Sequence, residues 1–123
     1  MSARSSAMVF LLGVLLFGSS SSLFAAESGA DLYKTYCWQC HGKSGDGMGV
    51  NVRDMSVQPR DHTDSKEMAS RSDDDLFKAI KEGGQAISKS VLMPPWGRSL
   101  SDEDIWAVVR YLRELCQCQY GSS

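Results

Sequence analysis

The sequence predicts one small domain built mainly from α-helices. Three stretches carry apolar residues at helical spacing, and the segments between them are rich in glycine, proline and polar residues without a sustained period. The length of 123 residues, with 42% hydrophobic and 23% charged residues, suits one globular domain and is too short for two.

The first segment lies outside this domain. Arg4 precedes an apolar run over residues 8–17, and serines and alanines follow it. This order is typical of a secretory signal peptide, which we expect over residues 1–26, with the domain over residues 27–123. The run is shorter than the about 20 residues of a membrane-spanning helix. We therefore expect an exported, periplasmic protein that is soluble after cleavage.

The first predicted helix covers residues 28–41. Ser28 is suited to cap its N-terminus, and Asp31 lies in the first turn, where the helix dipole favours negative charge. An apolar face follows at helical spacing, formed by Leu32, Tyr33 and Tyr36. The helix ends on the run Cys37-Trp38-Gln39-Cys40-His41.

The run from Cys37 to His41 has the pattern C-x-x-C-H, which is typical of covalent c-type haem attachment. The two thiols add to the vinyl groups of one haem, and the adjacent imidazole is placed to ligate the iron. A C-x-x-C pair alone also occurs in thioredoxin-like redox sites and as half of a zinc site. The histidine favours haem, so we expect one covalent haem c on Cys37, Cys40 and His41.

An irregular region is expected over residues 42–71. Residues 42–49 contain four glycines, which allow the backbone to pass close to a flat cofactor. Residues 50–71 show no sustained period and carry Pro59 among many polar residues. Long loops in compact domains are usually functional or disordered. We expect this one to wrap around the haem, with room for a short helical turn.

The second predicted helix begins with Asp73-Asp74-Asp75, which stabilise its positive end, and ends at Gly83-Gly84. Its buried stripe consists of Leu76, Phe77 and Ile80. Residues 93–97, Met-Pro-Pro-Trp-Gly, then form a rigid loop, because each proline restricts both itself and the residue before it.

The last predicted helix begins at Ser101, which caps it together with Asp104, and ends near Leu115 or Cys116. Arg110 and Arg113 complement the negative end of its dipole. Apolar residues recur along one face, at positions 105, 108, 109, 112 and 115.

An iron bound by His41 has a second axial position, for which sulfur and imidazole side chains are the candidates. Met93 is the predicted ligand, because Pro94-Pro95 hold the backbone beside it and limit reorganisation when the iron changes oxidation state. We interpret His62 as a partly exposed loop side chain, with a competing iron ligand as the alternative. The other candidates are Met48, Met55 and Met68.

Together these residues resemble the class I c-type cytochromes, in particular the small monohaem bacterial cytochromes c. The resemblance covers almost the whole chain after residue 26. It rests on a glycine and aromatic pair in the first helix, the haem attachment motif, the ligand loop and an aromatic residue in the last helix. In this sequence the glycine and aromatic pair is Gly29 and Tyr33, and the attachment motif is Cys37, Cys40 and His41. The ligand loop is Met93 and Pro94, and the aromatic residue of the last helix is Tyr111.

The resemblance implies an all-α cytochrome c fold, in which three to five helices wrap around one covalently bound haem with His41 and Met93 as axial ligands. It also implies that a proline carbonyl accepts a hydrogen bond from the proximal imidazole, and Pro59 is the candidate. Trp96, beside the ligand loop, is expected to pack near the haem or to hydrogen-bond a propionate.

The function that follows is a periplasmic carrier of single electrons without catalytic residues. The alternatives are a haem subunit of a larger respiratory redox complex, or a peroxidase or gas sensor, for which Met93 would have to leave the iron. We expect redox proteins as electron donor and acceptor, including membrane redox complexes on which the soluble protein docks. The formal net charge is −2, and no basic patch indicates binding to nucleic acid.

Cys116 and Cys118 lie outside the family pattern. Free thiols seldom persist in an oxidising compartment. We therefore expect an internal disulfide, a disulfide link to a partner or an additional ligand. Such close spacing strains a local disulfide. We favour the interpretation that this pair has no role in electron transfer.

Overall fold

The computed structural model describes residues 27–122. The predicted signal peptide, residues 1–26, lies outside the described residues. Within them the chain is helical and contains no strand, which confirms the all-α fold class. None of the helices in this part of the chain has the length and apolar character needed to cross a membrane. The elements are α1 (Gly29–Tyr36), α2 (Trp38–His41), η1 (Val52–Asp54), α3 (Ser65–Ala69), α4 (Asp73–Glu82), η2 (Gly84–Ile87) and α5 (Asp102–Cys116).

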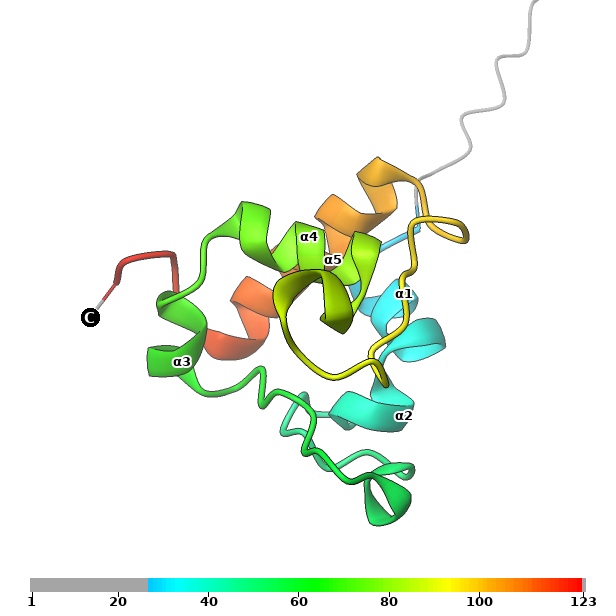
Figure 1. The fold of residues 1–123 in the computed structure, drawn as a ribbon. Helices are drawn as coiled ribbons and strands as arrows, with labels where there is room; N and C mark the ends of the chain where they lie inside the picture. The colour runs from blue at the N-terminus through cyan, green and yellow to red at the C-terminus, as the bar shows by residue number, and fades with distance from the viewer. Residues whose placement is uncertain (1–26, 123) are drawn as a thin grey trace, which may run out of the picture.

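Helix α5 is the centre of the packing, and both α1 and α4 lie against it (Figure 1). The apolar face predicted for the last helix is buried at residues 105, 108, 109 and 112, whereas Leu115 is only partly buried. The core is completed by apolar residues of the other helices, namely Leu32, Tyr33, Met68, Leu76 and Ile80. The irregular segment 42–64 extends below α2 in the view of Figure 1.

The helix starts follow from local cap chemistry. At α5 the backbone N–H of Asp104 donates to the Ser101 hydroxyl over 3.1 Å, and the Asp104 carboxylate accepts from the Ser101 N–H over 3.0 Å, as predicted. The same reciprocal pair forms at α4 between Ser72 and Asp75, although Ser72 was not identified from the sequence. Both pairs satisfy backbone donors that have no partner inside the helix.

The predicted helix over residues 28–41 is two helices that meet at Cys37. The φ angle of −113° at this residue departs from helical values near −63°. The N–H of Cys37 still donates to the Tyr33 carbonyl, over 2.9 Å, and its own carbonyl starts α2 by accepting from the His41 N–H over 3.0 Å. Cys37 therefore ends one helix and begins the next.

Gly29 lets α1 approach the backbone of α5. A Cβ atom at this position would lie 2.1 Å from the Ala107 carbonyl oxygen and 3.0 Å from the Tyr111 Cβ. We expect Gly29→Val to lower the free energy of unfolding of the haem-loaded protein by about 3 kcal/mol, the upper end for overpacking. Urea denaturation measures this loss. The matched control is Lys34→Val on the exposed side of α1, and an equal loss in both variants would contradict the close approach.

Arg113 is the buried polar centre of the interface between α5 and the preceding helices. Its side chain is only 6% exposed. Its guanidinium pairs with the Asp73 carboxylate over 2.8 Å and donates to the backbone carbonyls of Met68, over 2.8 Å, and Arg71, over 2.6 Å. The prediction that Arg113 complements the helix dipole is therefore incomplete, because the residue also joins α5 to α3 and α4.

We expect Arg113→Met to destabilise the protein by about 2–3 kcal/mol. Two backbone carbonyls lose their donor, and each unsatisfied buried group costs ~1–3 kcal/mol. The half-exposed Asp73 adds little, because solvent screens it. The unfolding midpoint in urea measures the effect. Arg110→Met, on the exposed side of α5, is the control and should change stability by less than about 0.5 kcal/mol; a similar loss there would contradict the assignment.

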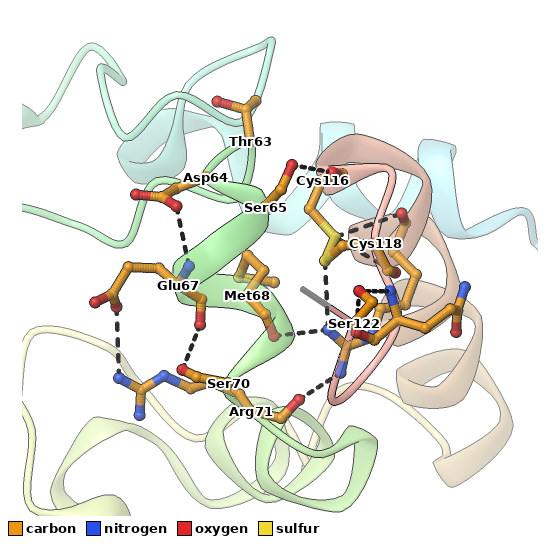
Figure 2. Close-up of a disulfide and its surroundings, with 12 residues drawn as sticks. Thr63, Asp64, Ser65, Glu67, Met68, Ser70, Arg71, Cys116, Cys118 and Ser122 are labelled. Carbon is orange, nitrogen blue, oxygen red and sulfur yellow. Dashed lines mark hydrogen bonds and ion pairs between the residues drawn. A yellow bond between two sulfur atoms is a disulfide. The ribbon is translucent and has the colours of Figure 1, made fainter.

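Cys116 and Cys118 form a disulfide with each other, with Cα atoms 5.2 Å apart (Figure 2). Of the three alternatives expected for this pair, the internal disulfide is confirmed. The possible link to a partner is wrong for this structure, because both sulfurs are used and both residues are buried. The chain reverses between them at Gln117, which adopts a left-handed conformation with φ 50°. The tail then lies on α3, where the Ser65 hydroxyl donates to the Cys116 carbonyl over 2.6 Å and the Gly121 N–H donates to the Ala69 carbonyl over 2.8 Å.

Candidate functional site

A cavity of about 710 Å³ opens between α2, the loop that follows it, α4 and the segment before α5. This volume is typical of sites for small molecules and cofactors. Most of its wall is apolar, including Leu76, Ile80, Val108 and Leu112 from the core. All six residues that were predicted to bind the cofactor line it, namely Cys37, Cys40, His41, Pro59, Met93 and Trp96.

Helix α2 has only four residues and is held in place by the glycine-rich loop that follows it. The carbonyls of Gln39, Cys40 and His41 accept from the backbone N–H groups of Asn51, Gly49 and Gly47, over 2.9, 3.1 and 2.8 Å. These bonds satisfy carbonyls that a helix end leaves without partners. Gly49 is required, because a Cβ there would lie 2.2 Å from the Gln39 carbonyl oxygen.

The His41 imidazole is oriented for metal binding through Nε2. Its Nδ1 lies 3.0 Å from the Arg60 carbonyl oxygen. Because a carbonyl can only accept, Nδ1 carries the proton and Nε2 keeps its lone pair. Burial lowers the pKa of His41, which keeps the ring neutral near pH 7. A neutral imidazole fixed in this tautomer is the form that binds iron.

The acceptor for His41 is the Arg60 carbonyl, so the prediction that Pro59 would fill this role is wrong. The Pro59 carbonyl faces Gly47 instead, where a Cβ would lie 2.8 Å from its oxygen. Successive peptide groups of an extended segment point in opposite directions, so the next carbonyl is the one that reaches the imidazole. Pro59 itself remains a wall residue of the cavity.

The two cysteines of the motif form no disulfide. Burial, with a smaller contribution from Cys40, raises the pKa of the Cys37 thiol to about 12. Thioredoxin-like sites depend on the opposite shift, toward a reactive thiolate. Within residues 27–122, no group of three or more His, Cys, Asp or Glu side chains could hold a metal ion. The raised pKa of the Cys37 thiol therefore disfavours the thioredoxin-like interpretation of the motif.

The loop that carries Met93 is tied to the end of α4. The Gly84 N–H donates to the Met93 carbonyl over 2.9 Å, and the Trp96 N–H donates to the Ile80 carbonyl over 3.0 Å. The loop can approach residue 84 this closely only because that residue is glycine. A Cβ on Gly84 would lie 2.2 Å from the Ser90 carbonyl oxygen. Sequence reasoning attributed the stiffness of this loop to Pro94-Pro95 and missed this second role of the Gly83-Gly84 pair.

The other candidate ligands differ in position. Met48 is 67% exposed, and Met68 is fully buried in the core. Met55 lines the cavity. His62 also lines it, and our interpretation of this residue as a partly exposed loop side chain is wrong, because it is 7% exposed. Its ring stacks on the His41 ring, with centroids 4.2 Å apart, so it comes from the same side of the cavity.

Arg71 supplies a donor that the protein leaves without a partner. Its Nε is buried and forms no hydrogen bond, and the residue lines the cavity together with Arg60. Both guanidinium groups are paired with Glu67. The Nε atom itself is closed off from the cavity, but the guanidinium groups of Arg60 and Arg71 at the cavity wall are suited to pair with a carboxylate such as a haem propionate. The cavity therefore fits a haem in volume, apolar lining and polar groups. No sequence pattern had indicated Arg71.

Trp96 is partly buried at the wall of the cavity. Its ring lies edge to face against Tyr36, with centroids 5.2 Å apart. This contact joins the loop that carries Met93 to α1 and supports the packing role expected for Trp96.

The fold and the site define a small c-type cytochrome, a protein that transfers electrons with a covalently bound haem c. Residues 24–112 match the profile of the family described as cytochrome C oxidase, cbb3-type, subunit III. This match covers most of the chain, which therefore belongs to that family. A search of curated protein sequences returned no significant match.

The solved structures that are similar to the chain include two c-type cytochrome or redox-complex chains. The KustC0563 c-type cytochrome shares 26% sequence identity and superposes with a TM-score of 0.59, covering 72% of this chain and 98% of that one. A chain of the Kuenenia stuttgartiensis reducing HAO-like protein complex Kustc0457/Kustc0458 shares 30% identity, with a TM-score of 0.56. The second likeness covers 71% of this chain but only 40% of that one.

Proposed function

We propose that the protein is a periplasmic carrier of single electrons. In this proposal Cys37 and Cys40 hold the haem through thioethers, and His41 and Met93 ligate its iron. When bound, the haem supplies a one-electron couple at the iron. The observation that carries the proposal is the convergence of these four side chains, from α1–α2 and from the loop after η2, on one apolar cavity.

The chain's own residues then determine how the couple behaves. The thioether of Met93 is a soft ligand that favours ferrous iron and raises the reduction potential. If His41 and Met93 both held the iron, small molecules would find no open coordination position on the metal. The hydrogen bonds from the Gly84 N–H to the Met93 carbonyl and from the His41 Nδ1–H to the Arg60 carbonyl hold both residues in place, so that little would reorganise when the electron moves.

Absorption spectra of the matured protein, oxidised and reduced, with and without carbon monoxide, test this proposal. We expect a low-spin reduced spectrum that carbon monoxide does not change. We also expect, in the ferric form, the weak red band of an iron–methionine bond. A high-spin spectrum that responds to carbon monoxide would overturn the proposed ligation and favour a peroxidase or gas sensor.

A second candidate is a haem subunit of a larger redox complex. It is favoured by the likeness to a chain of a reducing HAO-like protein complex. The likeness covers less than half of the length of that chain. The family profile is likewise described as a subunit. Size-exclusion chromatography of the native protein from its own cells distinguishes the two, because a carrier elutes as a free small protein and a subunit elutes with its partners.

Export is a separate part of the proposal. It is supported by the signal-like order of residues 1–26 and by the Cys116–Cys118 disulfide, which persists in oxidising compartments. Mass spectrometry of the periplasmic protein should give a mature chain that begins near residue 27 and carries one haem. A protein that stays in the cytoplasm with its first 26 residues intact would contradict export.

A further inference from the structure

His62 is a buried polar residue in the wall of the cavity for which the proposed ligation has no use. It is 7% exposed and follows the Pro59–Asp61 segment that supplies the acceptor for His41. Its imidazole lies nearly parallel to the His41 ring, with an angle of 18° between the planes and 4.2 Å between the centroids. A side chain that only filled space would not need this alignment.

The His62 ring is itself firmly held. Its backbone N–H donates to the Gly45 carbonyl over 2.6 Å, which fixes the chain at this point. Its Nδ1 lies 3.4 Å from the Tyr33 hydroxyl oxygen, and the hydrogen of that hydroxyl is donated to the Gly42 carbonyl over 3.2 Å. Tyr33 is 1% exposed and packs against Tyr111 of α5. The stacked ring is thereby connected to the α1–α5 interface.

The hydrogen bond to Arg60 restrains the His41 ring at one atom only, namely Nδ1. A flat ring packed against its face restrains a different motion, which is rotation of the imidazole plane about the bond from Nε2 to the metal. The two restraints are complementary, because one acts in the plane of the ring and the other acts perpendicular to it.

We propose that His62 is a positioning residue that fixes the plane of the His41 imidazole through its stacked ring. This inference rests on the proposed role of His41 as an iron ligand. The orientation of an axial imidazole plane determines how the unpaired electron of ferric iron is distributed. A fixed plane keeps that distribution, and with it the reduction potential, at a single value.

The test compares His62→Leu with His62→Phe in the haem-loaded protein. Leucine fills the space without a flat face, whereas phenylalanine keeps a flat ring and loses only the nitrogen atoms. We expect His62→Leu to shift the electron paramagnetic resonance g-values and to rearrange the haem-methyl proton resonances of the ferric protein. We expect His62→Phe to retain the wild-type pattern. Tyr33→Phe, which removes the hydrogen bond to the ring, should shift the resonances in the same direction as leucine but less.

The control is Leu100→Ala, a buried substitution away from the cavity, which destabilises the protein without touching either ring. Its resonances should match those of the wild type. Wild-type spectra in His62→Leu would overturn the stacking role, and so would equal shifts in the leucine and phenylalanine variants. Failure of the underlying ligation looks different, because the wild-type protein itself would then lack the signature of an axial imidazole.

Discussion

Replacement of Met93 by alanine should leave the haem attached and open one face of its iron to carbon monoxide. The two thioethers and His41 do not depend on the methionine, so the covalent bond survives. Loss of the soft sulfur ligand should lower the reduction potential by on the order of 0.1–0.2 V, a part of the about 0.8 V that axial ligands span. Carbon monoxide difference spectra and a redox titration measure both effects.

Met55→Ala is the matched control, because Met55 lines the same cavity and has the same side chain. It should keep a low-spin spectrum that carbon monoxide does not change. If Met55→Ala bound carbon monoxide and Met93→Ala did not, the sixth ligand would be Met55. We expect carbon monoxide to bind only to Met93→Ala, because hydrogen bonds hold the Met93 loop rigidly against α4.

The double variant Cys37→Ser/Cys40→Ser should not accumulate as a folded protein. Without its haem the domain contains a cavity of about 710 Å³. At ~24 cal/mol per Å³, an empty space of that size corresponds to roughly 17 kcal/mol, although water that enters from the open side offsets part of this. The total stability of a small domain is only about 5–15 kcal/mol. Pyridine haemochrome assays and circular dichroism measure haem content and folding.

The second cysteine pair provides the control for this experiment. Cys116→Ser/Cys118→Ser also removes two sulfurs, but neither lies at the cavity. It should keep a full haem complement and lose roughly 1.5 kcal/mol, the value for a very short closed loop. Equal haem loss in both double variants would show that the Cys37 and Cys40 thiols are not the attachment points.

The two longest helices, α4 and α5, were predicted correctly because their signals are local. The reciprocal cap of Ser101 and Asp104 involves residues three positions apart, and the buried stripe of α5 repeats with the helical period. The Gly83-Gly84 stop follows α4 directly. Each of these features is determined by neighbours within one or two turns, so composition and spacing were sufficient to identify them.

The position of Cys37 between α1 and α2 was not predicted, although it lies within a strong pattern. The apolar residues of this stretch continue at helical spacing through the break, so periodicity gave no sign of it. The bonds that hold α2 come from Gly47, Gly49 and Asn51, which are brought back to it by the loop. The break therefore depends on backbone contacts of a segment without any period.

The sequence by itself determined the helical class and the helix boundaries that depend on caps and glycines. It also determined which kinds of side chain, namely thiols, an imidazole and a thioether, are available to bind one cofactor. What only the tertiary structure decided is which groups meet across long separations. The acceptor for His41 is Arg60 and not Pro59, His62 is buried against His41, and Arg113 is paired with Asp73. Carbonyl direction, ring stacking and burial of a charge depend on the complete packing of distant segments, and no local spacing encodes them.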